Sequence, residues 1–126
     1  MYSGCEFPIV GTAACDVLRG RGIEAEYVGF VVPRAFGVLT AEREIKLPGT
    51  MEDITIYMPR NEAVEDIQIA IDDDAEILPP TPYTFEDPVL YYGSSITEGC
   101  SATHPLCNFV AYTARWVDAD FVNFGY

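Results

Sequence analysis

The sequence "VLYYGSSITEGC", residues 89–100, marks the point where the chain changes its hydrophobic pattern. It begins with a short apolar run without alternation, which is typical of a strand covered on both faces of a parallel sheet. A glycine, two serines and a second glycine then predict a loop. "CNFVAYTARWV" follows with the pattern of a helix, and "FVNFGY" is a second apolar strand. The order strand, loop, helix and strand predicts the opening unit of a three-layer α/β sheet.

The predicted helix carries an aromatic face. Phe109, Tyr112 and Trp116 are three and four residues apart, which places them on one side of a helix. The acidic residues at 118–120 predict its end. Tyr91, in the preceding strand, and Trp116 are expected in the core rather than in a platform for a substrate.

The N-terminal half has the pattern of β-structure. Runs that alternate or are rich in β-branched and aromatic residues occupy residues 26–32, 44–47, 53–59 and 64–71. The last two runs are joined by the polar link "RNEA" and predict an antiparallel hairpin with one buried face. Residues 15–29 predict another hairpin, with Gly20, Arg21 and Gly22 at its tip. Short strands separated by turns predict an antiparallel β-sandwich or jelly roll.

A proline-rich segment separates these two halves. Four prolines fall within residues 79–88, which excludes a helix or a central strand and predicts an extended linker. We therefore expect a β-sandwich domain at 1–78, a linker at 79–87 and the start of an α/β domain at 88–126.

The composition excludes several classes of partner. The chain has 126 residues, of which 20 are acidic and 7 are basic, and its net charge is −13. Nucleic acids and anionic membrane surfaces attract basic proteins, so neither is an expected partner. No apolar run reaches the roughly 20 residues of a membrane-spanning helix, and the first residues do not resemble a signal peptide. Localisation stays open: cytoplasmic if Met1 is the natural start, and secreted if the chain is truncated.

Cysteines and acidic residues suggest metal sites only weakly. The cysteines are Cys5, Cys15, Cys100 and Cys107. A zinc site from Cys100, His104 and Cys107 would lack a fourth protein ligand, and a Cys100–Cys107 disulfide is the other alternative. Residues 72–74 are three aspartates, which suit calcium, but they lack the EF-hand spacing and predict a solvated turn. No metal or other cofactor is expected.

The loop at residues 93–99 departs from two known motifs, one for phosphate binding and one for a nucleophile. In a P-loop, four residues separate the glycines and a lysine follows, whereas here the spacing is longer and Cys100 follows. The α/β-hydrolase elbow needs G-x-S-x-G, and Thr97 stands where its second glycine would be. Catalytic groups nevertheless collect at the carboxyl ends of strands in open α/β sheets, which is where this loop is predicted to lie.

The same residues resemble the first block of the SGNH hydrolases, the GDSL esterase and lipase superfamily. That block is typically G-D-S-[IL]-[TV]-x-G, and residues 93–99 have the sequence G-S-S-I-T-E-G. Ser94 replaces the usual aspartate, as in a subgroup with G-S-S-I-T-x-G. The resemblance implies that Ser95 is the nucleophile and that its backbone N–H contributes to the oxyanion hole. Gly93, Ser94 and Gly99 then form the surrounding turn.

Two further segments are similar to this subgroup. "FVNFGY" resembles the strand that leads into the second block, whose oxyanion glycine would follow Tyr126. Subgroup members carry a β-sandwich before the hydrolase domain, with a G-x-D-L-Y signature, of which "ACDVL" keeps Asp16. The resemblance therefore implies an N-terminal sandwich and a flavodoxin-like SGNH domain.

The implied function is a serine esterase that hydrolyses esters of small molecules or acetylated carbohydrates. The family takes its base and carboxylate from a C-terminal D-x-x-H motif, which is not present, and His104 is not at the matching position. Glu98 is expected to cap the loop. We therefore expect an N-terminal fragment of a hydrolase that has little activity alone, with a second copy as a candidate cover for its strands. The alternative is a non-catalytic β-sandwich that binds sugar or protein.

Overall fold

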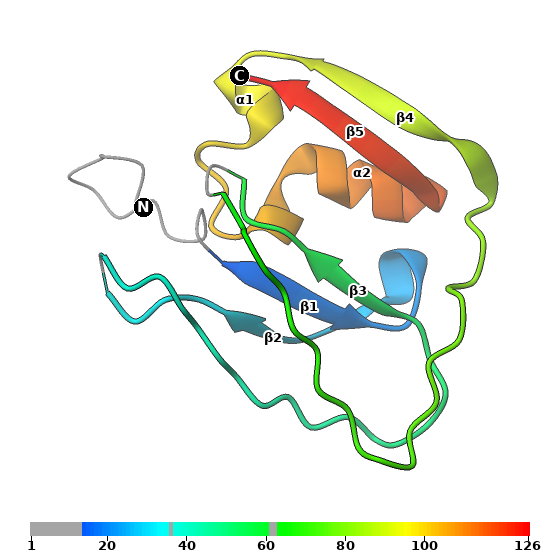
Figure 1. Ribbon diagram of the computed structural model, residues 1–126. Coiled ribbons are helices and arrows are strands. Elements are labelled where there is room, and N and C mark those ends of the chain that lie inside the picture. The colour runs from blue at the N-terminus through cyan, green and yellow to red at the C-terminus, as the bar shows by residue number, and fades with distance from the viewer. Residues whose placement is uncertain (1–13, 36, 61–62) are drawn as a thin grey trace.

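The computed structural model describes residues 14–35, 37–60 and 63–126, and its class is mixed α/β (Figure 1). A three-stranded antiparallel sheet has the order β2-β1-β3, formed by β1 (Cys15–Arg19), β2 (Glu26–Val31) and β3 (Ile54–Tyr57). A separate two-stranded parallel sheet pairs β4 (Phe85–Gly93) with β5 (Ala119–Gly125). The mixed class and the parallel pairing are confirmed. Among the described residues, no second antiparallel sheet completes a sandwich.

The hairpin predicted over residues 15–29 is confirmed. β1 pairs with β2 in antiparallel register, from Cys15 opposite Val31 to Arg19 opposite Glu26. A short 3₁₀ turn, η1 (Gly22–Glu24), lies in the connection. Gly20 and Gly22 have φ values of 79° and 59°, a region that glycine adopts without the steric penalty of a side chain. The glycines of the sequence therefore form the tip of the hairpin.

The connection from β4 to β5 contains more helix than expected. The loop after β4 forms α1 (Ser95–Glu98) and η2 (Pro105–Cys107), and the predicted helix is α2 (Phe109–Val117). Asn108 accepts a hydrogen bond from the backbone N–H of Ala111, 2.9 Å away, and so caps the start of α2. Asp118 ends the helix in the left-handed region, with φ 53°.

A small core forms where α2 lies between the two sheets (Figure 1). α2 contacts β5 on one side and η1 of the hairpin on the other. Its buried face consists of small residues, and the same core receives the centre of β1. The buried apolar residues are Ala14, Val17, Leu18, Val110, Ala111, Ala114 and Ala119. Small side chains allow the helix backbone to approach closely, and a Cβ at Gly22 would lie 3.4 Å from the carbonyl oxygen of Arg115.

The prediction that Trp116 lies in the core is wrong. Phe109, Tyr112 and Trp116 do share one face, but it is the face opposite the buried one, and Trp116 is 70% exposed. Tyr91 is half-buried and packs edge-on against Phe109, with 6.1 Å between ring centroids. The expectation that the strand after the linker is covered on both faces is also wrong, since Tyr92 is 85% exposed.

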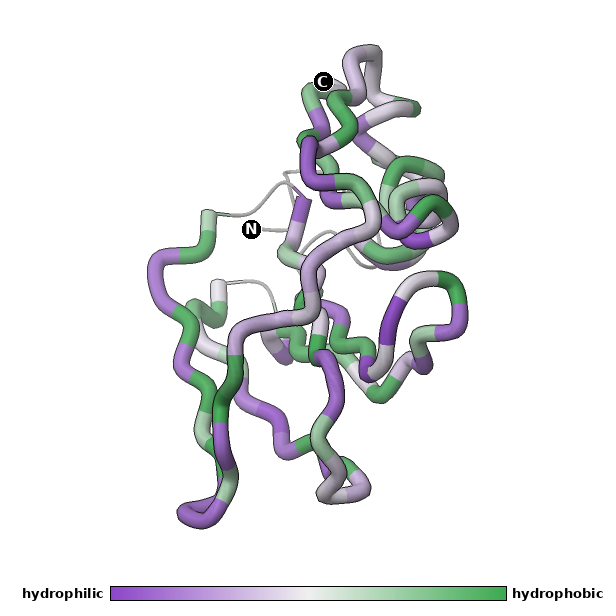
Figure 2. Tube along the Cα trace, turned by 90° about the vertical axis from the view of Figure 1, so that its right-hand side faces the viewer, coloured by the Kyte–Doolittle hydropathy of each residue, from purple (hydrophilic) through white to green (hydrophobic). Residues whose placement is uncertain are grey.

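The connections between strands are less regular than expected. Residues 44–47 and the described residues 63–71 contain no strand, so the hairpin predicted over 53–71 is not formed by the described residues. Only β3 remains of it, and it pairs with β1 instead. In Figure 2, hydrophobic and hydrophilic stretches follow one another along these long connections at the lower end of the molecule. The alternation is present in the sequence without a partner strand beside it.

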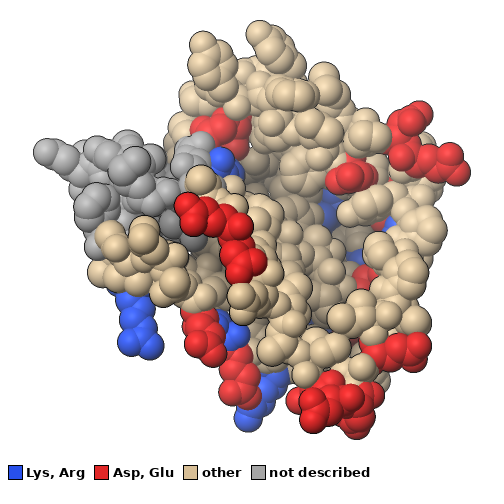
Figure 3. Space-filling model, viewed as in Figure 1, with Lys and Arg blue, Asp and Glu red and all other residues tan. Residues whose placement is uncertain are grey.

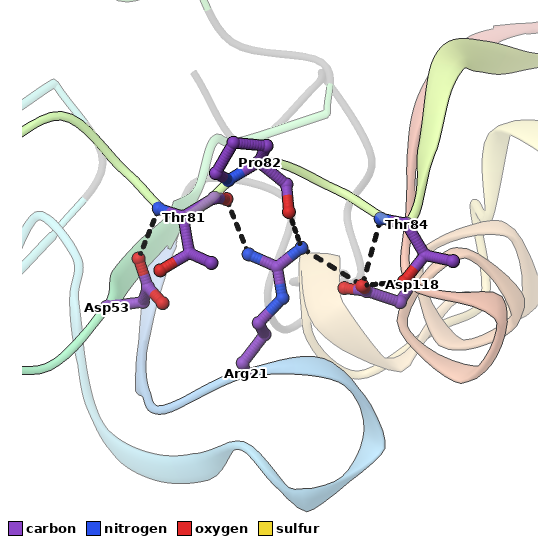
Figure 4. Close-up of polar contacts among 6 residues, drawn as sticks. All are labelled: Arg21, Asp53, Thr81, Pro82, Thr84 and Asp118. Carbon is purple, nitrogen blue, oxygen red and sulfur yellow. Dashed lines mark hydrogen bonds and ion pairs between the residues drawn. The ribbon is translucent and has the colours of Figure 1, made fainter.

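The proline-rich segment is held in place by a group of polar contacts that we call the Arg21 clamp (Figure 4). Arg21 donates hydrogen bonds to the carbonyl oxygens of Thr81 and Pro82, and its Nη2 lies 3.0 Å from Oδ2 of Asp118. Thr84 donates to the same carboxylate oxygen through its backbone N–H, at 3.1 Å, and its hydroxyl, at 2.6 Å. The predicted linker is thus fastened both to the hairpin tip and to the end of α2, and β4 begins within it at Phe85.

Candidate functional site

The two serines of the motif lie in the turn between β4 and α1. Gly93 is the last residue of β4, Ser94 has an extended conformation with φ −84° and ψ −169°, and Ser95 is the first residue of α1. Both serines are exposed. The chain therefore changes direction sharply at the carboxyl end of a parallel strand, where open α/β sheets gather their ligands.

Backbone hydrogen bonds hold the turn together. The carbonyl oxygen of Ser94 accepts from the N–H groups of Thr97, at 2.8 Å, and Glu98, at 3.0 Å. The carbonyl oxygen of Ser95 accepts from Gly99, at 2.9 Å, and Cys100, at 3.0 Å. None of the backbone hydrogen bonds of the described turn uses the N–H of Ser95, and the residue is exposed.

Glycines allow the backbone to pack closely around the turn. A Cβ at Gly93 would collide with the side chain of Thr97, and a Cβ at Gly125 would collide with the backbone of Glu98. Gly99 ends α1 with φ 92°, and a Cβ there would lie 2.6 Å from Cβ of Asn108. The end of β5 thus lies directly against the turn that carries the serines.

Two asparagines that were not identified from the sequence fasten the turn to its neighbours. Asn123 donates from Nδ2 to the carbonyl oxygen of Thr97, at 2.9 Å, and accepts from the N–H of Gly125, at 2.9 Å. Asn108 donates to the carbonyl oxygen of Glu98, at 3.2 Å, while it caps α2. The position of Asn108 at the start of a helix pattern is a capping signal that was present in the sequence.

A histidine–carboxylate pair lies at the first sheet. The side chain of Asp16 is fully buried in β1, and its Oδ1 lies 3.0 Å from Nδ1 of His104. Its Oδ2 accepts from the N–H of Leu106 at 3.1 Å. The rings of Tyr27 and Phe30 pack edge-on against His104. Burial raises the pKa of Asp16, and the hydrogen bond from Leu106 and the charge of His104 oppose that shift.

The structure does not bring Ser95 and His104 into contact. No hydrogen bond joins the Ser95 hydroxyl to another described residue, and the Nδ1 of His104 is used by Asp16. A carboxylate that holds Nδ1 leaves Nε2 as the free nitrogen, which is the arrangement of a base in a catalytic triad. His104 is half-buried, and its contact with Asp16 ties its loop to β1. The Oε1 atom of Glu98 has no hydrogen-bond partner, so the expected role of this side chain in capping or hydrogen-bonding the loop stays a prediction.

The metal alternatives find no assembled site in the part of the chain that the structure describes. Cys15, Cys100 and Cys107 are free thiols, so the Cys100–Cys107 disulfide is not formed. Cys5 lies outside the described residues. No group of three His, Cys, Asp or Glu side chains comes together among residues 14–35, 37–60 and 63–126, and this applies to the aspartates at 72–74 as well. Burial raises the pKa of the Cys15 thiol.

Comparisons with known proteins add no family assignment. No family model, curated protein or solved structure matches the chain. None of the helices described here is both long and apolar enough to span a membrane.

Proposed function

We propose that the chain carries the nucleophilic turn of a serine ester hydrolase of the SGNH/GDSL type, with Ser95 as the nucleophile. The observation that supports this most directly is the position of Ser95: exposed, first in α1, and directly after the carboxyl end of parallel strand β4. The neighbouring strand β5 ends against the same turn. The sequence G-S-S-I-T-E-G therefore coincides with a geometry that suits a nucleophile.

The proposed reaction is acyl transfer through a covalent intermediate. Ser95 Oγ attacks the ester carbonyl carbon, its proton passes to a base, and the C–O bond to the alcohol breaks with protonation of the leaving oxygen. The N–H of Ser95 donates to the oxyanion. Water then attacks the acyl-serine, which releases the acid and restores the hydroxyl. Acetylated carbohydrates are the proposed substrate class.

No hydrogen bond joins the Ser95 hydroxyl to another described residue, so we assign no residue as the general base. Without a base, an oxyanion donor and a bound ester still accelerate acylation over water. Deacylation also needs activated water. We therefore expect that this chain accepts an acyl group at Ser95 faster than it releases it, and that turnover is slow.

The alternative function is a binding module without chemistry. The observation that favours it is that the Ser95 hydroxyl has no hydrogen-bond partner among the described residues, so nothing in contact with it increases its basicity. On this alternative, the serines are an ordinary turn between a strand and a helix.

Site-resolved acetylation separates the two functions. The chain is incubated with p-nitrophenyl acetate near pH 8, digested, and each serine-containing peptide is quantified by mass spectrometry as a function of time. We expect Ser95 to be acetylated at least about tenfold faster than Ser94, because Ser95 occupies the position of the nucleophile in the proposed motif and its own N–H would donate to the oxyanion.

Ser94 is the matched control, since it is exposed and adjacent in the same turn. Ser95→Ala should abolish the fast acetylation, whereas Ser94→Ala should retain it. Equal rates at Ser94, Ser95 and the exposed Ser101 would contradict a nucleophilic role and favour the binding module.

A further inference from the structure

β3 lies at the edge of the antiparallel sheet, because the strand order is β2-β1-β3 and no described strand pairs with its other side. A cleft with a volume of about 710 Å³ runs beside it. Eight consecutive residues, 53–60, line this cleft, and other walls come from the proline-rich segment and β5. In Figure 3, acidic side chains are spread over this side of the molecule, and the basic atoms near its middle are recessed. The free side of β3 therefore borders a groove.

The backbone of β3 directs alternate residues towards its free side. The carbonyl oxygen of Asp53 accepts from the N–H of Gly20, at 2.8 Å, which continues the ladder between β1 and β3. In an antiparallel ladder, residues whose N–H and C=O groups face the neighbouring strand alternate with residues whose groups face away. Every second residue from Asp53 therefore faces β1, and Ile54 and Ile56 direct their N–H and C=O groups away from it.

These outward backbone groups are unprotected in the part of the chain that the structure describes. Apart from the ladder with β1, none of the hydrogen bonds between described residues uses the backbone of Ile54 or Ile56. Residues 54–57 have the sequence ITIY, which contains neither a charge nor a proline. Proteins usually protect their edge strands with such residues, because an open edge is a template for an added strand.

β5 lies on another wall of the cleft, and its own free edge is protected. The N–H of Tyr126 donates to a carbonyl oxygen at the end of β4, so the residues that alternate with Tyr126 face away from β4. Side chains take two of their N–H groups, because Oδ1 of Asp120 accepts from Phe121, at 2.8 Å, and Oδ1 of Asn123 accepts from Gly125, at 2.9 Å. A strand added in the cleft would therefore pair with β3 rather than with β5.

The charge and the walls of the cleft select the kind of strand. The chain has a net charge of −13, and four acidic residues against three arginines line the cleft. A second copy would bring the same negative charge, whereas a basic peptide is attracted. The rings of Tyr57 and Phe121 stack in the cleft, with 6.3 Å between their centroids. Since the side chains of a strand alternate, apolar residues at every second position can meet these rings.

We propose that the free edge of β3 binds an extended peptide in which basic and apolar residues alternate. The peptide backbone pairs with Ile54 and Ile56, and its apolar side chains pack against Tyr57 and Phe121. The four residues of β3 span about 13 Å, so a peptide of about five residues covers the edge. This interaction requires no reaction at Ser95, so it is independent of the proposed esterase function.

The first test is amide hydrogen exchange of the full chain, followed by NMR with and without the acetylated and amidated peptide Lys-Val-Lys-Val-Lys. In the free chain, we expect the amides of Ile54 and Ile56 to exchange at least about tenfold faster than those of Thr55 and Tyr57, which donate to β1. Saturating peptide should slow the exchange of the first two selectively. Slow exchange of all four amides in the free chain would overturn the proposal, because the edge would then already be paired.

The second test separates strand pairing from attraction between charges and needs no variant of the protein. Two isomers of the peptide are compared by calorimetric titration, one N-methylated at the three lysines and one at the two valines. Each isomer keeps every side chain and the charge, but it loses the N–H groups of one edge of the peptide. We expect one isomer to bind at least about tenfold more weakly than the parent peptide and the other to retain its affinity.

A peptide with glutamate in place of each lysine tests the preference for basic residues. We expect it to bind at least about tenfold more weakly than the parent, because it brings negative charge to an acidic chain. Equal affinity of the two methylated isomers, equal affinity of the lysine and glutamate peptides, or absence of binding at millimolar parent peptide would each overturn the proposal.

Discussion

β1 of the antiparallel sheet and β4 of the parallel pair are stabilised in different ways. β1 lies between two partner strands, and Asp16, Val17 and Leu18 at its centre are buried. β4 has one partner and exposes Leu90 and Tyr92. Close packing in the β4 region is between backbones, at its glycines, rather than between large side chains. A well-defined turn can therefore be built from glycines and hydrogen bonds without a large core beside it.

The largest effect is expected at the buried carboxylate of β1. Asp16→Ala removes the acceptor of the Leu106 N–H and the partner of His104, and it leaves a cavity. We expect a loss of about 3 kcal/mol in the free energy of unfolding, measured by urea denaturation. Asp16→Asn keeps the volume and one oxygen, so it should cost about 1 kcal/mol. If Asp16→Ala lowers the free energy of unfolding by less than about 1 kcal/mol, Asp16 does not stabilise β1.

The pH dependence of this variant pair has a definite sign. Burial raises the pKa of Asp16 above its unfolded value of about 3.9. The stability linked to its protonation is therefore fully present below that pH and is lost as the pH rises through the folded pKa. Relative to Asp16→Asn, the wild type should gain stability on acidification, because the asparagine cannot titrate. A constant difference between pH 3 and 7 would contradict the raised pKa.

The next effect breaks the backbone packing of the β4 region. Gly125→Ala places a Cβ against the backbone of Glu98, so β5 or α1 must shift. We expect a loss of about 2 kcal/mol, together with faster amide exchange at Thr97 and Glu98. The control is Phe124→Ala, which removes a large but 54% exposed side chain from the same strand. If Phe124→Ala lowers the free energy of unfolding more than Gly125→Ala does, the contrast between the two regions is wrong.

Local patterns account for much of the fold that could be predicted. The glycines at 20 and 22 require a tight connection, and the unalternating strand followed by a helix predicts parallel pairing. The orientation of α2 could not be predicted in this way, because Phe109, Tyr112 and Trp116 and the small residues on the other side have the same period. Hydrophobicity favours the aromatic face, but close approach to β5 and η1 favours the face of Val110 and Ala114.

Long-range contacts were outside the reach of sequence patterns. Asp16 and His104 are 88 residues apart, and the clamp joins Arg21 to Asp118 across 97 residues. In neither pair does the sequence around one residue indicate which distant residue it contacts. The alternation in residues 64–71 was misleading for the related reason that a strand needs a neighbour to accept its hydrogen bonds. The serine turn was predictable because its glycines and serines lie within seven residues.

A smaller effect is expected at the clamp between the regions. Hydrogen bonds from Thr84 and Arg21 lower the pKa of Asp118, so its contribution is present above the unfolded pKa of about 3.9 and is lost as the pH falls through the folded pKa. Asp118→Asn should cost about 1 kcal/mol near pH 7, and the cost should shrink as the pH falls through the folded pKa. Asparagine tolerates the positive φ, so the backbone is unaffected. Asp120→Asn, two residues away and exposed, should be neutral over the same pH range.

The smallest effect is expected on the exposed face of α2, where the two sides of one helix repeat the comparison. Trp116→Gln should cost less than about 0.5 kcal/mol, because the indole is 70% exposed, whereas Val110→Ala on the buried side should cost about 2 kcal/mol. Trp116 is the one tryptophan of the chain, so its fluorescence reports this face alone. We expect emission close to that of tryptophan in water and ready quenching by acrylamide. A blue-shifted, protected emission that moves to the red on dilution would show that a second copy covers this face, and then Trp116→Gln should be as costly as Val110→Ala.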